Sequence, residues 1–217
     1  MRRPEFGAAL LTALVRVEGR PLGLIANNPA RLGGAIDSDA ADKAARFMQL
    51  CDAHGMPIVS LCDTPGFSVG PAAERTATVR HLSRMFVVGA NLTVPLCTVI
   101  LRKAYGLGAM AMAGGSLKVP LATVAWPTGE LGAMGLEGAV RLGFRRELAA
   151  APDPDRLLAE LVRQAYEHGK ALNAASMFEL DDVIDPADTR RWIVTTLAGG
   201  CAAPAPSGKR RPHVDTW

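Results

Sequence analysis

The strongest constraint on the fold comes from two short segments that are apolar on both faces. They are PIVSLCD at residues 57–63 and VPLCTVILR at residues 94–102, and a segment with helical periodicity separates them. Strands of this kind are typical of a parallel sheet that is covered on both sides, because parallel strands need a crossover connection, usually a helix. The alternation therefore predicts an α/β domain with helices packed over the sheet.

The rest of the chain continues this alternation. Residues 12–17 and 21–27 flank Glu18-Gly19-Arg20 and predict a β-hairpin, followed by a turn-rich loop at 27–37. Asp37 or Ser38 is expected to cap a helix that stops at Gly55. A further strand is predicted at 123–126, and further helices at 72–92, 128–144, 153–172 and in a last segment that ends at residue 199. We expect one domain over residues 1–203 and a polar tail over residues 204–217.

Composition excludes several classes of protein. The net charge is only +3 in 217 residues, and the basic side chains are scattered except at 208–213, so nucleic-acid binding has little electrostatic support. No run approaches the roughly 18 apolar residues of a membrane span. The four cysteines are far apart in the sequence and form no C-x-x-C motif, which favours free thiols in a reducing cytoplasm. They are Cys51, Cys62, Cys97 and Cys201.

Side chains suited to acid–base or metal chemistry are scarce. His54 and His168 lie at helix ends, His81 lies on a helix and His213 lies in the tail, so none is favoured as a general base. No metal site is predicted, because no pair of ligating side chains has ligand spacing on one element. The remaining option is catalysis by backbone N–H groups at the corner GLG, residues 106–108, where a buried strand meets a helix. Tight packing of Gly106 and Gly108 explains the same spacing equally well.

Three motifs together carry a resemblance to a known family. DTPGF at 63–67, RKAYG at 102–106 and AWPTGELGAMG at 125–135 occur in the order and spacing of the carboxyl-terminal half of biotin-dependent acyl-CoA carboxyltransferases. This family includes the propionyl-CoA and acetyl-CoA carboxylase beta chains. The resemblance implies a crotonase-like fold, a spiral of ββα units. It also implies that the amino-terminal half, which mainly holds the acyl-CoA, is absent from this chain, whereas the half present mainly holds carboxybiotin.

The resemblance assigns roles to residues of this chain. It implies that the backbone amides of Leu107 and Gly108 stabilise the oxygen of biotin's ureido ring as CO2 is released, so that no protein acid or base is needed. Met110 stands where the family often has an aspartate associated with acyl-chain choice. The residues implied to bind substrate are Tyr105, Gly106, Ala109, Met110, Pro65, Gly66, Phe67, Gly34 and Ala35. For Lys43, Arg46, Arg102 and Lys103, ion pairing within the protein is favoured over binding of phosphates, and Glu130 and Glu137 are interpreted as structural.

The expected partners follow from the same resemblance. They are an acyl-CoA, a biotin carboxyl carrier, a biotin carboxylase component and the amino-terminal carboxyltransferase half, within a homo- or hetero-oligomer. Whether the chain is a fragment, a separately encoded half or an inactive orphan stays open. Two alternative functions also stay open: a crotonase-type hydratase, isomerase or decarboxylase of CoA esters, and a non-catalytic assembly subunit.

Overall fold

The computed structural model describes residues 5–200 and Val214. The basic cluster at 208–213, Cys201 and, apart from Val214, the predicted tail at 204–217 lie outside the described residues.

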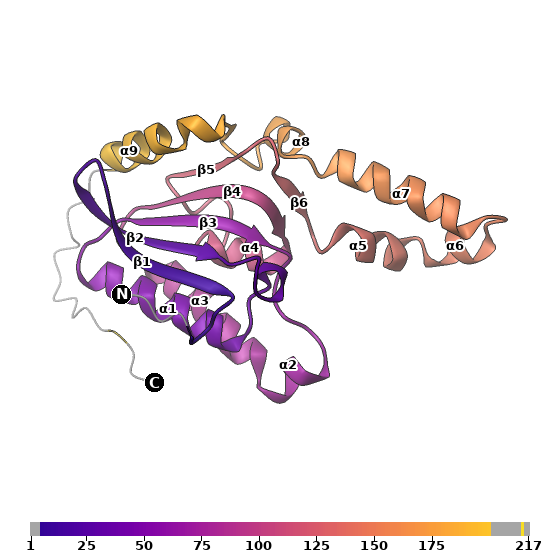
Figure 1. Ribbon diagram of the computed structural model, residues 1–217, viewed down its shortest axis with the longest axis horizontal. Coiled ribbons are helices and arrows are strands. Elements are labelled where there is room, and N and C mark those ends of the chain that lie inside the picture. Colours follow the sequence, from indigo (N-terminus) through magenta and orange to yellow (C-terminus); the bar gives the residue numbers. More distant parts are fainter. Residues whose placement is uncertain (1–4, 201–213, 215–217) are drawn as a thin grey trace.

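A single sheet organises the described part of the chain (Figure 1). Its strands run in the order β1-β2-β3-β4-β5-β7, and β6 pairs with the far end of β4. The first two strands are antiparallel, and all the other pairs are parallel. The bounds are β1 Leu10–Val17, β2 Arg20–Asn27, β3 Ile58–Thr64, β4 Leu96–Tyr105, β5 Ala122–Ala125, β6 Glu130–Gly132 and β7 Asp182–Val183. The predicted α/β class is confirmed.

The predicted hairpin is the β1–β2 pair. Its two-residue turn, Glu18 and Gly19, has φ values of 49° and 79°. Positive φ at both positions matches the twist of the flanking strands, which is why short hairpins favour this turn.

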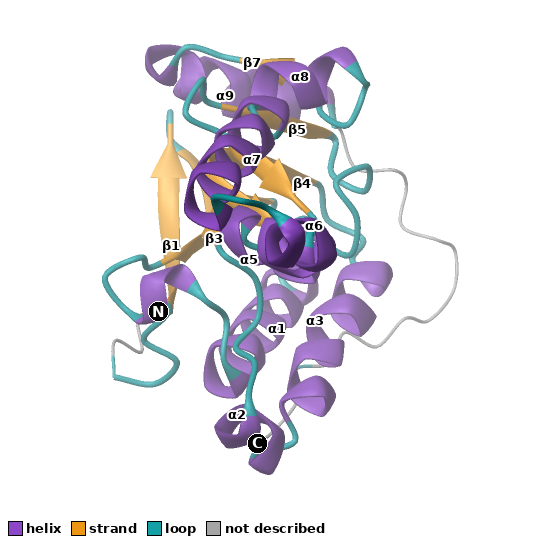
Figure 2. Cartoon of the chain, turned by 90° about the vertical axis from the view of Figure 1, so that its right-hand side faces the viewer, coloured by secondary structure: helices purple, strands orange, loops and turns teal. Residues whose placement is uncertain are grey.

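Helices cover both faces of the sheet (Figures 1 and 2). Helices α1 (Ser38–Ala53) and α3 (Thr78–Asn91) lie on one face, and α9 (Thr189–Gly199) lies on the other. Asp37 caps α1 by accepting a hydrogen bond from the N–H of Ala40. An arm made of α5 (Leu136–Gly143), α6 (Arg145–Ala150) and α7 (Pro154–His168) extends away from the sheet, and α8 (Ala171–Ser176) leads back to it.

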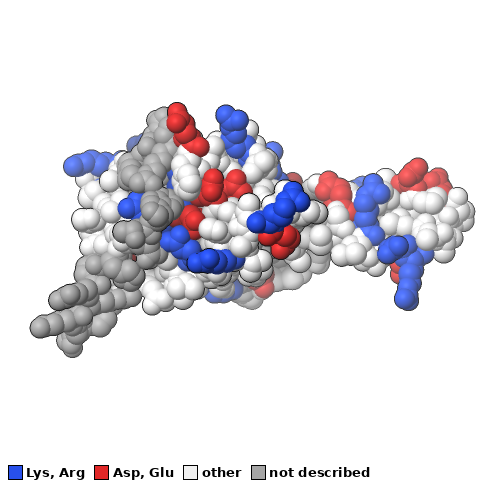
Figure 3. All heavy atoms as spheres, turned by 90° about the horizontal axis from the view of Figure 1, so that it is seen from below, with Lys and Arg blue, Asp and Glu red and all other residues white. Residues whose placement is uncertain are grey.

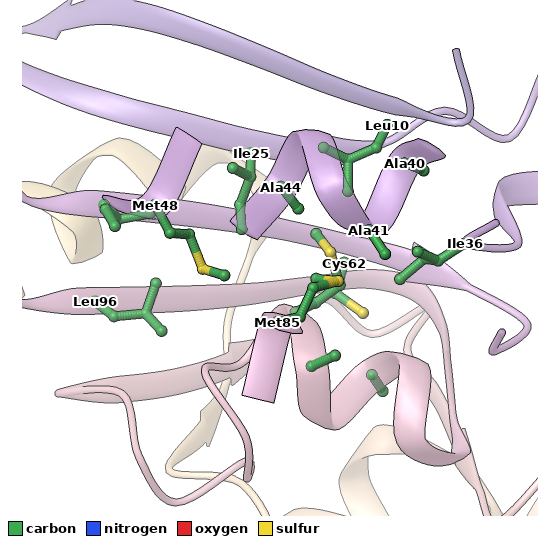
Figure 4. Close-up of a cluster of buried hydrophobic side chains, with 14 of the residues drawn as sticks. Leu10, Ile25, Ile36, Ala40, Ala41, Ala44, Met48, Cys62, Met85 and Leu96 are labelled. Carbon is green, nitrogen blue, oxygen red and sulfur yellow. The ribbon is translucent and has the colours of Figure 1, made fainter. Parts of the chain in front are cut away.

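The main core lies between the sheet and helices α1 and α3. Figure 4 shows Leu10 and Ile25 from the first two strands pointing toward α1, Leu10 near Ala40 and Ala41 and Ile25 near Ala44. Small alanine side chains let α1 approach the sheet closely, and Met48 is fully buried. A smaller cluster under α9 includes Leu22, Val59, Cys97 and Ile193.

The surface carries charges of both signs. On the face drawn in Figure 3, basic and acidic side chains are interspersed over the body and along the arm. None of the helices in the described part of the chain has the length and apolarity that crossing a bilayer requires.

The prediction of one helix over 72–92 was wrong. The segment forms α2 (Pro71–Arg75) and α3, with Ala77 between them at a φ of 52°. The hydroxyl groups of Thr76 and Thr78 both donate to the carbonyl of Ala73, at 2.8 and 2.6 Å. Threonine side chains that bond to the backbone compete with helical hydrogen bonds, so the helix breaks here.

The helix predicted over 128–144 was also wrong in its first part. Residues Glu130–Gly132 form β6, because the end of β4 offers a free edge for pairing and the N–H of Leu131 bonds to the carbonyl of Gly169 at 2.7 Å. The helix predicted over 153–172 ends at His168, and α8 begins at Ala171 after a short β-bridge at Lys170. Helix α6 and strand β7 were not predicted.

Candidate active site

The residues predicted to bind substrate lie on three segments, 34–35, 65–67 and 105–110, which meet in this order at the carboxyl edge of the sheet. Strand β3 leads into Pro65, Gly66 and Phe67, and β4 leads from Tyr105 directly into helix α4 (Gly106–Met112). The loop that carries Gly34 and Ala35 follows β2 through a short 3-10 turn at Leu32–Gly34. Neighbouring parallel strands bring their carboxyl ends to one edge, so segments that are far apart in sequence become neighbours.

Backbone contacts join the first two segments. The N–H of Ile36 donates to the carbonyl of Gly66 at 3.0 Å, and the N–H of Ser68 donates back to the carbonyl of Ile36 at 2.9 Å. The hydroxyl group of Thr64 also donates to the Gly66 carbonyl, at 3.1 Å. This exchange of bonds fixes Ala35 and Phe67 on adjacent extended segments.

Gly66 and Gly108 join the second and third segments. A β-carbon placed on Gly108 would come within 2.7 Å of the Gly66 α-carbon and 2.8 Å of its carbonyl carbon. Gly106 has a φ of 56°, and a β-carbon there would lie 2.7 Å from the carbonyl oxygen of Ala133. Both glycines are therefore required for close packing of backbone against backbone, which is one of the two roles that the sequence left open for them.

The side chains of the third segment divide into exposed and buried ones. Leu107 is 60% exposed and Met110 is 40% exposed, whereas Ala109 packs into the main core. Tyr105 is also buried, and its hydroxyl donates to a carboxylate oxygen of Glu130 at 2.7 Å. Burial, followed by this hydrogen bond, raises the pKa of Tyr105 well above its usual value. Leu107 and Met110 are thus the side chains of α4 that face solvent near the corner.

The N–H groups of Leu107 and Gly108 lie in the first turn of α4. The first N–H groups of a helix have no acceptor within the helix. The Tyr105 side chain makes no capping hydrogen bond to them. Among residues 5–200, no side chain and no loop carbonyl accepts a hydrogen bond from either group.

An acidic group at the centre of this edge was not singled out from the sequence. The Asp63 carboxylate, at the end of β3, accepts hydrogen bonds from Arg102 Nη2 at 3.1 Å and from the backbone N–H of Lys103 at 3.2 Å. Its hydrogen bond and charge raise the pKa of the Arg102 guanidinium. Lys103 Nζ donates to the carbonyl of Gly33 at 2.6 Å. The sequence did contain a signal for this contact in the positions of the charges. Asp63 ends one buried strand, and Arg102 and Lys103 come at the end of the next one.

Other candidate groups have structural roles. Lys43 is 4% exposed, and its Nζ donates to the carbonyls of Phe6 at 2.9 Å and Leu10 at 2.7 Å, so it ties the amino-terminal segment to α1. Glu137 accepts a hydrogen bond from Tyr166, and His81 pairs with Asp42.

The three cysteines of the described residues are buried, which keeps their thiols protonated. Burial raises the pKa of the Cys51 and Cys62 thiols to about 12 and the pKa of the Cys97 thiol to about 11. Within the described residues, no three His, Cys, Asp or Glu side chains lie close enough together to hold a metal ion.

Comparisons with known proteins identify the family. The sequence model of the carboxyl transferase domain matches residues 2–211. The chain is 43% identical over 196 residues to the methylmalonyl-CoA carboxyltransferase 12S subunit of Propionibacterium freudenreichii subsp. shermanii, covering 88% of this chain and 37% of that protein. It is 38% identical over 213 residues to the biotin-dependent acetyl-/propionyl-coenzyme A carboxylase beta6 subunit of Mycobacterium tuberculosis, covering 95% of this chain and 44% of that protein.

Solved structures agree with the sequence comparison. A single-chain, multi-domain long-chain acyl-CoA carboxylase is 62% identical with a TM-score of 0.82, covering 89% of this chain and 19% of the other. The transcarboxylase 12S hexamer with methylmalonyl-CoA bound is 40% identical with a TM-score of 0.84, covering 95% of this chain and 40% of the other.

These matches confirm the crotonase-like α/β fold expected from the motifs. The chain spans less than half the length of the curated relatives that it matches. The sequence match nevertheless includes all three segments of the carboxyl edge. The chain therefore belongs to the carboxyl transferase domain family.

Proposed function

We propose that the chain is the carboxybiotin-side half of a biotin-dependent acyl-CoA carboxyltransferase and works together with an amino-terminal half that holds the acyl-CoA. The observation that carries the proposal is the meeting of residues 33–35, 65–67 and 105–110 at one edge of the sheet, in a chain that matches this family over most of its length. Domain boundaries at 203 and 204, a location in the cytoplasm and assembly into an oligomer belong to the same proposal.

The carboxyl edge suits the ureido ring of biotin, which is uncharged and has one carbonyl oxygen. Two backbone N–H groups of Leu107 and Gly108 are placed together in the first turn of α4, where the helix dipole adds positive potential. The exposed side chains of Leu107 and Met110 offer apolar contact beside them. Carboxybiotin, attached to its carrier, supplies the carboxyl group.

The protein's contribution is stabilisation of negative charge rather than proton transfer. In the proposed mechanism, the Leu107 and Gly108 amides donate to the ureido oxygen as it becomes negative, and one such donor is worth about 2.7 to 4 kcal/mol in other enzymes. The carboxylates nearest this corner are held by other groups, Asp63 by Arg102 and Glu130 by Tyr105. This engagement disfavours the alternative of a crotonase-type hydratase or isomerase that uses a carboxylate of this chain.

A proline at Leu107 tests the donor role. The change removes one N–H within the first helical turn, where proline is tolerated, and the native side chain points to solvent. A proline at Gly108 is a poorer test, because its β-carbon would collide with Gly66. Leu107→Ala is the matched control, since it keeps the N–H group.

The assay supplies the amino-terminal half, a carboxylated biotin carrier and an acyl-CoA, and it measures carboxyl transfer. We expect Leu107→Pro to reduce the rate about 100- to 1,000-fold and Leu107→Ala to change it little. Equal rates for Leu107→Pro and Leu107→Ala would exclude the donor role. Absence of transfer by the unmodified chain with its partner, together with no binding of biotin, would favour the non-catalytic assembly subunit.

A long acyl chain is the substrate that we propose. The 62% identity to a solved long-chain acyl-CoA carboxylase supports it, as does the apolar Met110 at the position where the family often has aspartate. Each buried methylene adds about 0.8 kcal/mol of binding in an apolar pocket. Measuring kcat/KM with palmitoyl-CoA and propionyl-CoA decides the matter, and a preference for propionyl-CoA contradicts the proposal.

A further inference from the structure

The pairing of β3 with β4 is irregular at the carboxyl edge. Cys62 pairs with Ile100 and Thr64 pairs with Ala104, so the register shifts between these two positions. Asp63 therefore lies opposite three residues of β4, at 101–103. Irregularities of this kind bend a strand and change the direction of its last residues, and they are common beside active sites.

The Asp63 side chain bridges this irregularity. Its Oδ1 accepts the backbone N–H of Lys103 at 3.2 Å, in place of a ladder hydrogen bond. The same carboxylate accepts from Arg102 Nε at 3.4 Å and Nη2 at 3.1 Å, and Lys103 Nζ lies 3.9 Å from Oδ1. Asp63 is only 8% exposed, and a buried carboxylate without such partners would be strongly destabilising.

The backbone of Asp63 contacts the end of β2 and the loop that follows it, residues 33–35, which we call the glycine loop. Its N–H donates to Asn27 Oδ1 at 3.0 Å. A β-carbon on Gly34 would lie 2.3 Å from the carbonyl oxygen of Asp63, so Gly34 packs directly against this oxygen. Lys103 completes the connection through its bond to the Gly33 carbonyl. One residue thus touches β4 and the glycine loop from the end of β3.

We infer that Asp63 is a positioning residue, which sets where the glycine loop, Gly66 and the start of α4 lie relative to one another. Gly66 lies three residues beyond Asp63, and Gly106 lies three residues beyond Lys103. Because the backbone of Gly66 packs against Gly108, a shift of β4 against β3 moves the first turn of α4. Arg102 and Lys103 act on this edge through Asp63 and Gly33 rather than through phosphates of a substrate. The effect on catalysis rests on the proposed function, whereas the effect on geometry does not.

Asp52 provides a matched control. It is also a carboxylate that accepts backbone hydrogen bonds next to β4, from the N–H of Thr93 at 2.6 Å and of Val94 at 3.2 Å. These residues precede the amino end of β4, remote from the carboxyl edge. Asp52→Ala therefore measures what the loss of a backbone-capping carboxylate does in general.

Amide hydrogen exchange on the isolated chain tests the geometric part. In Asp63→Ala we expect the bonded amides of residues 35–36 and 103–104 to exchange at least about tenfold faster than in the unmodified chain. Asp63→Asn keeps one acceptor oxygen for Lys103, so its effect should be smaller. Asp52→Ala should speed exchange only near 93–94. Unchanged exchange at 35–36 in Asp63→Ala, or an equal increase there in Asp52→Ala, overturns the inference.

Kinetics with the amino-terminal half test the catalytic part. A misplacement of about 1 Å can lower a catalytic rate by up to about 100-fold. Asp63→Ala should therefore lower kcat by up to this order, while KM for the acyl-CoA changes about twofold or less. Partial recovery in Asp63→Asn and normal kcat in Asp52→Ala are expected. The positioning role is contradicted if Asp63→Ala has a normal kcat, including the case in which only its KM for the acyl-CoA changes. If the unmodified chain shows no transfer, the proposed function fails, and hydrogen exchange still decides the role of Asp63.

Discussion

Replacing Gly108 with alanine is the sharpest test of how the corner is built. The new β-carbon would lie 2.7 Å from the Gly66 α-carbon, whereas ordinary contacts begin at 3.4 Å. The start of α4 and the Gly66 segment must therefore separate by about 0.7 Å. Both contacting groups are backbone atoms, so no flexible side chain can turn aside to make room.

The magnitude follows from this displacement. Adding a methyl group to a packed site typically costs about 1–3 kcal/mol, and for a domain of this size each kcal/mol lowers Tm by about 2–4 °C. A displacement approaching 1 Å at a catalytic donor reduces the rate by up to about 100-fold. Gly108→Ala should therefore be moderately less stable and much less active.

Gly138→Ala is the matched control. Gly138 lies within α5, and its β-carbon would meet only the end of the Met134 side chain, at 3.7 Å. Alanine is favoured over glycine in a helix by about 0.8–1.0 kcal/mol, so this variant should be more stable. Thermal unfolding followed by circular dichroism, together with the carboxyl-transfer assay, compares the two. If Gly108→Ala equals the unmodified chain in both Tm and rate, the close contact with Gly66 has no consequence and our account of the corner is wrong.

Two further predictions concern stability. The pKa of the Cys62 thiol is about 12 in the folded protein, against an ordinary value of 9.0. Above pH 9 this thiol loses its proton on unfolding, so the free energy of unfolding should fall as the pH rises from 9 toward 12. The fall due to this thiol is at most about 1.4 kcal/mol per pH unit. Denaturant titrations at several pH values should show a shallower fall in Cys62→Ala, and an unchanged slope would contradict the cause. Lys43→Met removes the donor of the hydrogen bonds to the carbonyls of Phe6 and Leu10. Urea unfolding should show that the free energy of unfolding falls by about 1–3 kcal/mol. A variant of normal stability would refute this prediction.

The elements with strong local signals could be predicted from the sequence. The β1–β2 hairpin depends on a turn of two residues, and α1 has a capping aspartate and a terminal glycine, so neighbours in sequence determine both. Strand β6 depends instead on the free edge at the end of β4. Its sequence follows Gly129 and ends on Gly132, so it has no strong preference of its own. The partner that decides its state lies 27 residues before Glu130, at Lys103.

The candidate site was predictable in part for the same reason. The corner at 106–108 was singled out from its glycines, and Gly34 and Gly66 were singled out through the family resemblance; the structure brings these residues to one edge. Asp63 was quoted only as part of a motif and given no role, because its importance comes from a register shift between two strands. A sequence shows which residues can accept hydrogen bonds, but a shift in register is a property of the pair of strands.

Packing and catalysis therefore place different demands on the two residues at the corner. Gly108 must lack a side chain because Gly66 occupies the space, whatever the corner binds. Leu107 has no such restriction, since its side chain is 60% exposed and its N–H is its contribution to the proposed site. Substitutions at Gly108 accordingly report on the fit between α4 and the Gly66 segment, and loss of the N–H at Leu107 reports on charge stabilisation. If Leu107→Pro lowers the rate no more than Leu107→Ala does, the corner acts through its shape alone.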